Sequence, residues 1–395
     1  MARNLDRLKD LVPHILHRLP VKSLVRFRGV HKSWSDLIKD PNFIFDHLQT
    51  LNQINMDNYG FCFLVKRIWP ADPLFLVGKD FVHALGFHQA ATLDFLDIVF
   101  KHRSYPGSFQ MYGPLNGVYY IHKKPSLLIN PSMREFRFVP ETPPFPENLI
   151  AIRHNGFGFD HRTDDYKVVC ITSFFIGEDM LRRVHVYALS CNYWRNVDCP
   201  FPSCVHIQCQ PLSDTFVHGA SHWWACDGDG ELVLAFDMLD EMFQVIRFPK
   251  PEVKSCNNFP GNVAKFKEFL AVILCPEYVT EKQFDIWVML EYGKKESWIK
   301  LFTIGPIAGV QKPLAFWKDG IVFGDNSGGM VLYDTQTEMK ESFEFRIEPL
   351  MATAYMESVV SLRRDIDDIV PELRFDTIQI ERFQRPQLFS LVSFR

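Results

Sequence analysis

A strand–turn–strand unit recurs through most of this chain of 395 residues. In each copy an apolar run rich in β-branched residues ends at a turn residue, and an aromatic or equivalent residue opens the next run a few positions later. The turn residues are Asn130, Ser190, Asp237, Glu291 and Asp334. They follow one another at intervals of 60, 47, 54 and 43 residues. A period of roughly fifty residues indicates a repeat architecture.

Upstream strands complete these units. Residues 156–159 and 165–171 read as one upstream pair, and residues 217–225 belong to another. Four antiparallel strands per unit make a propeller blade, with central strands buried on both faces. We therefore expect an all-β, kelch-like propeller of six blades. Its ring must close, and we expect residues 355–362 to pair with the first blade near residues 61–65.

The first fifty residues have helical patterning instead. In residues 8–19 the apolar side chains follow a three-four spacing that puts them on one side of a helix. Pro20 ends that helix because it lacks an amide donor. Asp40 and Pro41 supply an N-cap and a first helical residue for a last helix. Four short helices form a small all-α bundle, often completed by association, so the fold class is α+β multidomain.

The bundle resembles an F-box. The family's leucine-proline, Val-Lys-Ser-Leu, Arg-Phe and Lys-Ser-Trp elements stand at residues 19–20, 21–24, 26–27 and 32–34. The chain departs from the family at residues 7–11, Arg-Leu-Lys-Asp-Leu, where members commonly begin with Leu-Pro-Glu-Asp-Leu. The resemblance implies that a Skp-type adaptor binds here and connects the chain to a cullin and a RING subunit. The positions that match the family's helical core imply eight adaptor-binding residues: Leu11, Ile15, Leu16, Leu19, Pro20, Val21, Leu24 and Trp34.

The repeat region resembles the plant F-box-associated domain. The resemblance rests on residues 130–132, 156–159, 165–169, 286–293 and 313–318. Within that group, residues 286–317 are most similar to the S-locus F-box proteins of pollen. The resemblance implies a substrate-recognition subunit of an SCF-type cullin-RING ubiquitin ligase, whose propeller binds the protein to be ubiquitinated and which catalyses nothing itself. The S-locus branch implies non-self stylar ribonucleases as that protein.

These readings divide the chain into four parts. We expect an F-box at 8–48, a linker at 49–58, the propeller at 59–362 and a tail of unknown role at 363–395. Recognition of the target is expected in loops on one propeller face and in the irregular segments 66–112 and 199–216, because loops vary while blades keep the fold.

Charge and cysteine usage limit the partners and the compartment. The first fifty residues carry nine Lys and Arg against five Asp and Glu, and the remainder carries 34 against 42, a net charge of −8. This balance suits a basic protein partner and, without an aromatic-interleaved basic stripe, argues against nucleic acid. The nine cysteines include no Cys-x-x-Cys pair, which predicts free thiols in a reducing compartment, the cytoplasm or the nucleus. The longest apolar run near the middle, residues 269–275, is too short to span a bilayer, so we expect no membrane contact.

Motifs that could carry chemistry have simpler explanations. Cys199, Cys204, Cys209 and His206 lack the spacing of common zinc sites and read as free thiols near a loop. Residues 227–231 read as a hairpin turn, and Ser221 and His222 alternate onto opposite faces of a strand. The tryptophans at 194, 223, 224, 287, 298 and 317 are expected to pack between blades. We therefore expect no metal, no cofactor and no catalytic residue.

Two alternatives stay open. One is an F-box receptor of the same architecture for an unrelated plant protein. The other is a propeller enzyme or lectin with a helical cap, which would not co-purify with a Skp-type adaptor.

Overall fold

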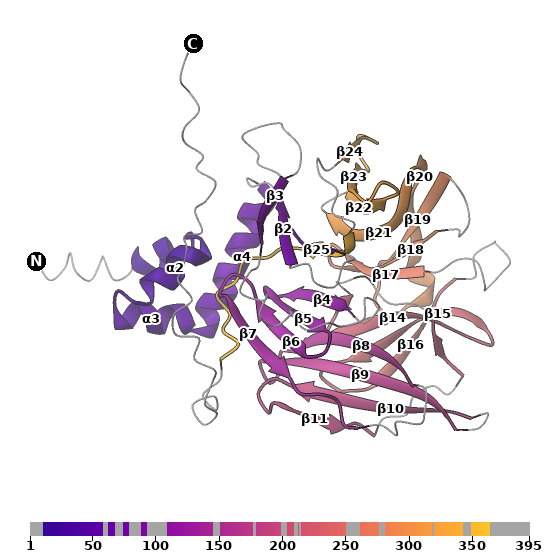
Figure 1. The fold of residues 1–395 in the computed structure, drawn as a ribbon, viewed down its shortest axis with the longest axis horizontal. Coiled ribbons are helices and arrows are strands. Elements are labelled where there is room, and N and C mark those ends of the chain that lie inside the picture. The colour runs from indigo at the N-terminus through magenta and orange to yellow at the C-terminus, as the bar shows by residue number, and fades with distance from the viewer. Residues whose placement is uncertain are drawn as a thin grey trace, which may run out of the picture. The chain divides into compact units, whose positions relative to one another are not determined.

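The structure is a computed structural model of the chain (Figure 1). It describes residues 11–57, 62–67, 74–78, 88–92, 109–144, 151–176, 179–198, 204–208, 212, 215–249, 261–275, 281–317, 320–342 and 349–363. The chain divides into two compact units, residues 1–362 and 363–395. All but the first residue of the expected tail lies outside the described residues.

Four helical segments open the described part. Residues 11–16 are helical, followed by α2 (Val21–Phe27), α3 (Lys32–Lys39) and α4 (Pro41–Asp57). The first segment ends before residue 19, where its end was expected, because the amides of Arg18 and Leu19 bond to carbonyls only three residues back, at 3.2 and 3.1 Å. This tighter bonding closes the last turn of a helix.

Helix α4 starts at the expected N-cap, Asp40, but extends beyond residue 48, where the linker was expected to begin. Oδ1 of Asp40 accepts hydrogen bonds from the amides of Asn42 (2.8 Å) and Phe43 (3.2 Å), as an N-cap does. The helix then continues to Asp57, through most of the residues expected to form a linker. Leu48 and Leu51 explain this, because both remain buried one turn apart on the same side of the helix.

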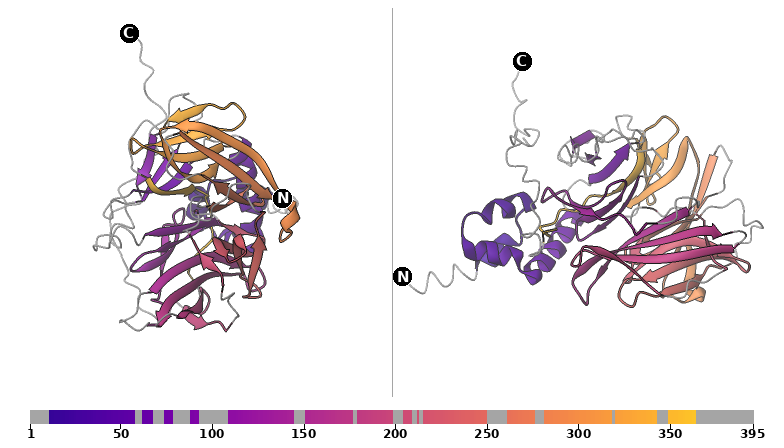
Figure 2. Two further views of the ribbon diagram at one scale, coloured as in Figure 1. Left: turned by 90° about the vertical axis from the view of Figure 1, so that its right-hand side faces the viewer. Right: turned by 60° about the horizontal axis from the view of Figure 1, so that its bottom comes forward.

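The described strands form six antiparallel sheets, seen from two further directions in Figure 2. The first contains β25 (Pro349–Ala354), β1 (Cys62–Arg67), β2 (Leu74–Gly78) and β3 (His88–Thr92), and the second β4 (Gln110–Leu115), β5 (Val118–His122), β6 (Ser126–Asn130) and β7 (Glu135–Val139). The third contains β8 (Ala151–Asp160), β9 (Asp165–Ile176), β10 (Asp179–Ala188) and β11 (Tyr193–Asn196). The fourth contains β12 (His206–Ile207), β13 (Phe216–Val217), β14 (Ala220–Asp227), β15 (Gly230–Asp237) and β16 (Phe243–Arg247). The fifth contains β17 (Gly261–Phe266), β18 (Phe269–Leu274), β19 (Glu281–Met289) and β20 (Trp298–Ala308), with the short 3-10 helix η3 (Lys295–Ser297) before β20. The sixth contains β21 (Val310–Trp317), β22 (Gly320–Asp325), β23 (Met330–Asp334) and β24 (Lys340–Ser342).

The expected order of a helical bundle followed by a β-propeller is confirmed.

Three of the five recurring turn residues form the same side-chain turn. Asn130, Asp237 and Asp334 end β6, β15 and β23, and each side chain accepts a hydrogen bond from the amide two residues later, at 3.0, 2.7 and 2.8 Å. This turn directs the chain into the last strand of its sheet. The sequence period is therefore the spacing of equivalent hairpins in successive sheets.

The first sheet is closed by the end of the chain, but not by the expected residues. Residues 349–354 pair with β1, with Leu64 opposite Thr353 and Val65 opposite Ala352. Residues 355–362, which were expected to form that strand, are not in a sheet. They are held instead by side chains at the end of the second sheet, since Oε2 of Glu135 accepts a hydrogen bond from the amide of Leu362 at 2.8 Å. The segment 66–112, expected to be irregular, contains β2 and β3.

Buried aromatic side chains pack between neighbouring sheets, as expected. Trp223 and Trp224 are both fully buried, and they point into two different apolar clusters on either side of β14. Trp298 is buried in the same cluster as Trp224, and Trp287 packs against it. Each blade thus contributes to two interfaces, one on each face.

Candidate functional site

The helical bundle has its own apolar core. Leu16, Val21, Leu24, Ile38 and Phe43 are buried together with Val359. Two histidines line this core. The ring of His17 stacks on Phe43 with centroids 4.3 Å apart, and Nε2 of His47 lies 2.9 Å from the carbonyl oxygen of Leu19. Burial lowers the pKa of both histidines, so each is neutral near pH 7.

The eight residues predicted to bind an adaptor fall into three groups. Leu16, Val21 and Leu24 are buried inside the core of the bundle, so they support its surface rather than form it. Leu19 and Trp34 are half-buried and pack against that core. Leu11, Ile15 and Pro20 are exposed. Direct contact of any of the eight with an adaptor stays a prediction.

The helical bundle exposes several large apolar side chains. Leu11 and Ile15 are 52% and 57% exposed, and Val30 and Phe45, which the sequence motif did not single out, are 63% and 62% exposed. We call these four residues the apolar surface of the bundle. Contiguous exposed apolar side chains mark interaction sites, and among these four Leu11 and Ile15 lie one turn apart on the first helix.

One segment near residue 360 contacts both the bundle and the propeller. Val359 belongs to the core of the bundle, and Oε2 of Glu357 accepts a hydrogen bond from the amide of Val21 at 3.4 Å. On its other side, the carbonyl oxygens of Ser358 and Val360 accept hydrogen bonds from Nδ2 of Asn130, at 3.2 and 2.7 Å. Residues 357–360 therefore contact both the helices and the second sheet.

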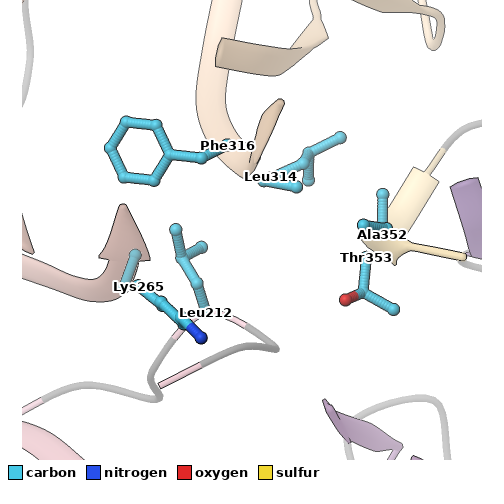
Figure 3. Close-up of a pocket in the computed structure, with 9 residues that line it drawn as sticks. Leu212, Lys265, Leu314, Phe316, Ala352 and Thr353 are labelled. Carbon is cyan, nitrogen blue, oxygen red and sulfur yellow. The ribbon is translucent and has the colours of Figure 1, made fainter. Parts of the chain in front are cut away.

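The propeller contains a small cavity between β17, β21 and β25 (Figure 3). Leu212 and Lys265 lie on one side of it, Leu314 and Phe316 on a second and Ala352 on a third. Its volume of about 40 Å³ holds at most a few water molecules. A cavity of this size cannot enclose an organic substrate.

Further features of the sequence concern possible chemistry or a membrane. Cys199 and Cys209 lie outside the described residues, and among the described ones no group of three metal-ligating side chains occurs. Residues 228–229 join β14 to β15, which confirms the hairpin turn. Oγ of Ser221 donates to the carbonyl of Phe157 on β8 at 2.9 Å, whereas Nε2 of His222 lies 2.8 Å from the hydroxyl of Tyr292, in the turn after β19. The two side chains therefore lie on opposite faces. No helix of the described part is long and apolar enough to cross a bilayer.

A bundle of short helices that exposes apolar side chains, followed by six antiparallel sheets of a β-propeller, defines a two-domain protein. Residues 9–46 match the F-box domain, and residues 82–343 match the F-box associated beta propeller domain. The chain belongs to the family of F-box proteins with an F-box-associated β-propeller.

Curated relatives match most of this chain. F-box protein CPR1 of Arabidopsis thaliana is 27% identical over 381 residues, covering 89% of this chain and 87% of the relative. An F-box/kelch-repeat protein of the same plant is 24% identical over 332 residues, covering 82% and 86%. Among solved structures, a mutant of AofleA from Arthrobotrys oligospora gives a TM-score of 0.36 at 10% identity, over 76% of this chain and 91% of that one. That score is too low to support any inference.

Proposed function

We propose that this protein is the substrate receptor of an SCF-type cullin-RING ubiquitin ligase. The bundle binds a Skp-type adaptor, which connects it to a cullin and a RING subunit, and the propeller binds the protein to be ubiquitinated. The receptor contributes proximity rather than chemistry, because it raises the effective concentration of target lysines near the conjugating enzyme. Such a receptor acts in the cytosol or the nucleus.

The observation that carries this proposal is the apolar surface of the bundle. Leu11 and Ile15 lie one turn apart and are exposed, while Leu16 beside them is buried in the bundle's own core. The first helix thus presents one apolar side inward and a second one outward. A partner that covers the second side removes it from water, which is favourable by about 25 cal/mol per Å² of apolar area.

The test is co-purification of the full chain with a Skp-type adaptor. We expect the double variant Leu11→Glu, Ile15→Glu to lose at least about tenfold in adaptor affinity, because two charges replace the apolar contact. Its melting temperature stays unchanged, since both side chains are exposed. Phe138→Glu on β7, where Phe138 is 47% exposed, is the matched control and keeps full binding. Equal adaptor binding by the double variant and the control contradicts the proposal.

As the target we propose non-self stylar ribonucleases. Fewer observations support this proposal than support the receptor function. Residues 286–317 resemble the S-locus F-box proteins, and the net charge of −8 after residue 50 suits a basic partner. Immobilised full chain is expected to retain ribonucleases from non-self styles and to release those from self styles. If the chain retains neither kind of ribonuclease, this target is excluded. The receptor function then remains, with an unrelated plant protein as substrate.

A further inference from the structure

The third sheet contains a row of residues that no role described so far explains. Its strands β8, β9 and β10 lie side by side (Figure 1). Arg153 on β8 and Arg183 on β10 are both opposite Thr172 on β9. Directly opposite residues of antiparallel strands share a face, so the two guanidinium groups project from the same face of the sheet, two strand spacings apart, about 10 Å.

The groups around this row are hydrogen-bond donors and cations. Arg153 is half-buried, and within the described part of the chain no hydrogen bond or ion pair engages its guanidinium. His185, two residues along β10 from Arg183 and on the same face, is 8% exposed, and its Nδ1 has no hydrogen-bond partner among the described residues. A buried polar atom without a partner is costly unless a ligand or water satisfies it.

The charge around the row is positive. Burial and the charges of Arg183 and Arg153 lower the pKa of His185. Burial and the charges of Arg153 and Lys124 lower the pKa of His122, on the neighbouring sheet, to about 4. Every charged group that perturbs these two histidines is therefore an Arg or a Lys. The nearest acidic residue along β10 is Asp179, at the tip of the hairpin and four positions from Arg183.

Exposed apolar side chains surround the same end of the sheet. Ile176 and Leu181, on the same face as the two arginines, are 53% and 45% exposed, and Ile152 and Phe175, on the other face, are also about half exposed. The guanidinium of Arg183 lies over the ring of Phe174, with Cζ 5.6 Å from the ring centroid. Arginine beside aromatic and aliphatic side chains is the composition of the centre of many protein interfaces.

We propose that the end of the third sheet that carries Arg153 on β8 and Arg183 on β10 binds a short segment of the substrate protein. This segment carries an anionic group, a carboxylate or a phosphate, next to an apolar residue. Arg153, Arg183 and His185 hold the anion, and Leu181 and Ile176, on the same face of the sheet, contact the apolar residue. Guanidinium groups bind both anions through paired, charge-assisted hydrogen bonds. This inference rests on the proposed function as a substrate receptor and assigns the class of segment that the receptor selects.

The test uses the full chain and peptide libraries with one fixed central residue, which is Asp, phosphoserine, Asn or Ser. We expect Asp or phosphoserine peptides to bind at least about tenfold more tightly than their neutral counterparts, with apolar residues selected beside the anion. Which of the two binds more tightly identifies the anion as carboxylate or phosphate.

Two variants and one control connect binding to the site. Arg153→Gln and Arg183→Gln each remove the preference for the anion, and Arg183 is exposed, so its variant keeps the fold. Arg162→Gln, at the opposite end of the same sheet and 65% exposed, keeps the preference. Equal binding of neutral and anionic peptides, no binding at about 1 mM peptide, or full preference in Arg183→Gln overturns the inference. Adaptor binding by these variants is measured separately, so a failure of the receptor function is distinguished from a failure of this site.

Discussion

The side-chain amide of Asn130 donates a hydrogen bond of 2.7 Å to the carbonyl oxygen of Val360, 230 residues away in sequence. The same side chain accepts hydrogen bonds from the amides of Ser132 (3.0 Å) and Met133 (3.3 Å), and it is fully buried. One residue therefore forms the hairpin turn after β6 and also holds the segment that contacts the helical bundle. Asn is suited to this position because its side chain both donates and accepts.

Asn130→Ala is expected to destabilise the protein by more than the loss of a turn. The substitution leaves the carbonyls of Ser358 and Val360 without this donor, and an unsatisfied buried group costs about 1–3 kcal/mol. Asp334→Ala is the control, because Asp334 makes the same kind of turn, is exposed and bonds only to nearby backbone amides. Urea unfolding should show a loss for Asn130→Ala at least about 1 kcal/mol greater than for Asp334→Ala. Equal losses contradict the role assigned to Asn130.

A buried ion network links the third and fourth sheets. Nζ of Lys167 lies 2.6 Å from Oδ2 of Asp160 and 3.0 Å from Oε1 of Glu241, and it donates to the carbonyl of Met238 at 2.8 Å. Lys167→Met leaves the buried carboxylate of Asp160 without its ion-pair partner, and we expect a loss of about 3–5 kcal/mol in the free energy of unfolding. Lys300→Met, which breaks the more exposed pair with Asp285 at 3.4 Å, should cost no more than about 1 kcal/mol. Similar losses for both variants contradict this account.

The same network predicts a pH dependence. Burial alone would raise the pKa of Asp160, but hydrogen bonds from Lys167 and from the amide of Arg162 outweigh it and hold the pKa below the ordinary value of 3.8. A lowered pKa in the folded state stabilises the protein above the unfolded pKa and stops doing so as the pH falls through the folded one. The stability difference between wild type and Lys167→Met should therefore be largest above about pH 5 and shrink below pH 4. A difference that is constant from pH 7 to pH 3 contradicts the assignment.

Local chemistry made the blades predictable from the sequence. A residue such as Asn130, Asp237 or Asp334 bonds to amides two or three positions later, so its effect is visible in a short window of sequence. The apolar runs before each marker are equally local. The apolar run precedes all five markers, the side-chain turn is formed at three of them, and together these signals located the repeat.

Long-range pairing was not predictable in the same way. Residues 349–354 and residues 355–362 are both short and partly apolar, and the choice between them depends on partners hundreds of residues away. Glu135 and Asn130 hold the later segment outside the sheet, which leaves Ala352 and Thr353 to pair with β1.

In the bundle, too, the sequence alone did not determine which side chains face solvent. Helical spacing identified Leu11, Ile15 and Leu16 as one stripe, but only the packing of the helices determines that Leu16 faces the core and that the other two face solvent. Val30 and Phe45 lie inside the F-box match but were not among the eight predicted residues, because their exposure depends on tertiary structure.

Two glycines make room for the tryptophans between blades. A Cβ atom built on Gly261 would lie 2.5 Å from the ring of Trp224, and one on Gly156 would lie 2.7 Å from the ring of Trp223. Both rings are fully buried and cannot move aside, so Gly261→Ala is expected to cost about 1–3 kcal/mol through overpacking. Gly228→Ala in the hairpin after β14 is the control, because its Cβ would meet no atom within 4 Å, and it should change stability by no more than about 1 kcal/mol. If thermal unfolding gives the two variants the same melting temperature, the close approach of Gly261 to Trp224 does not limit packing between these sheets.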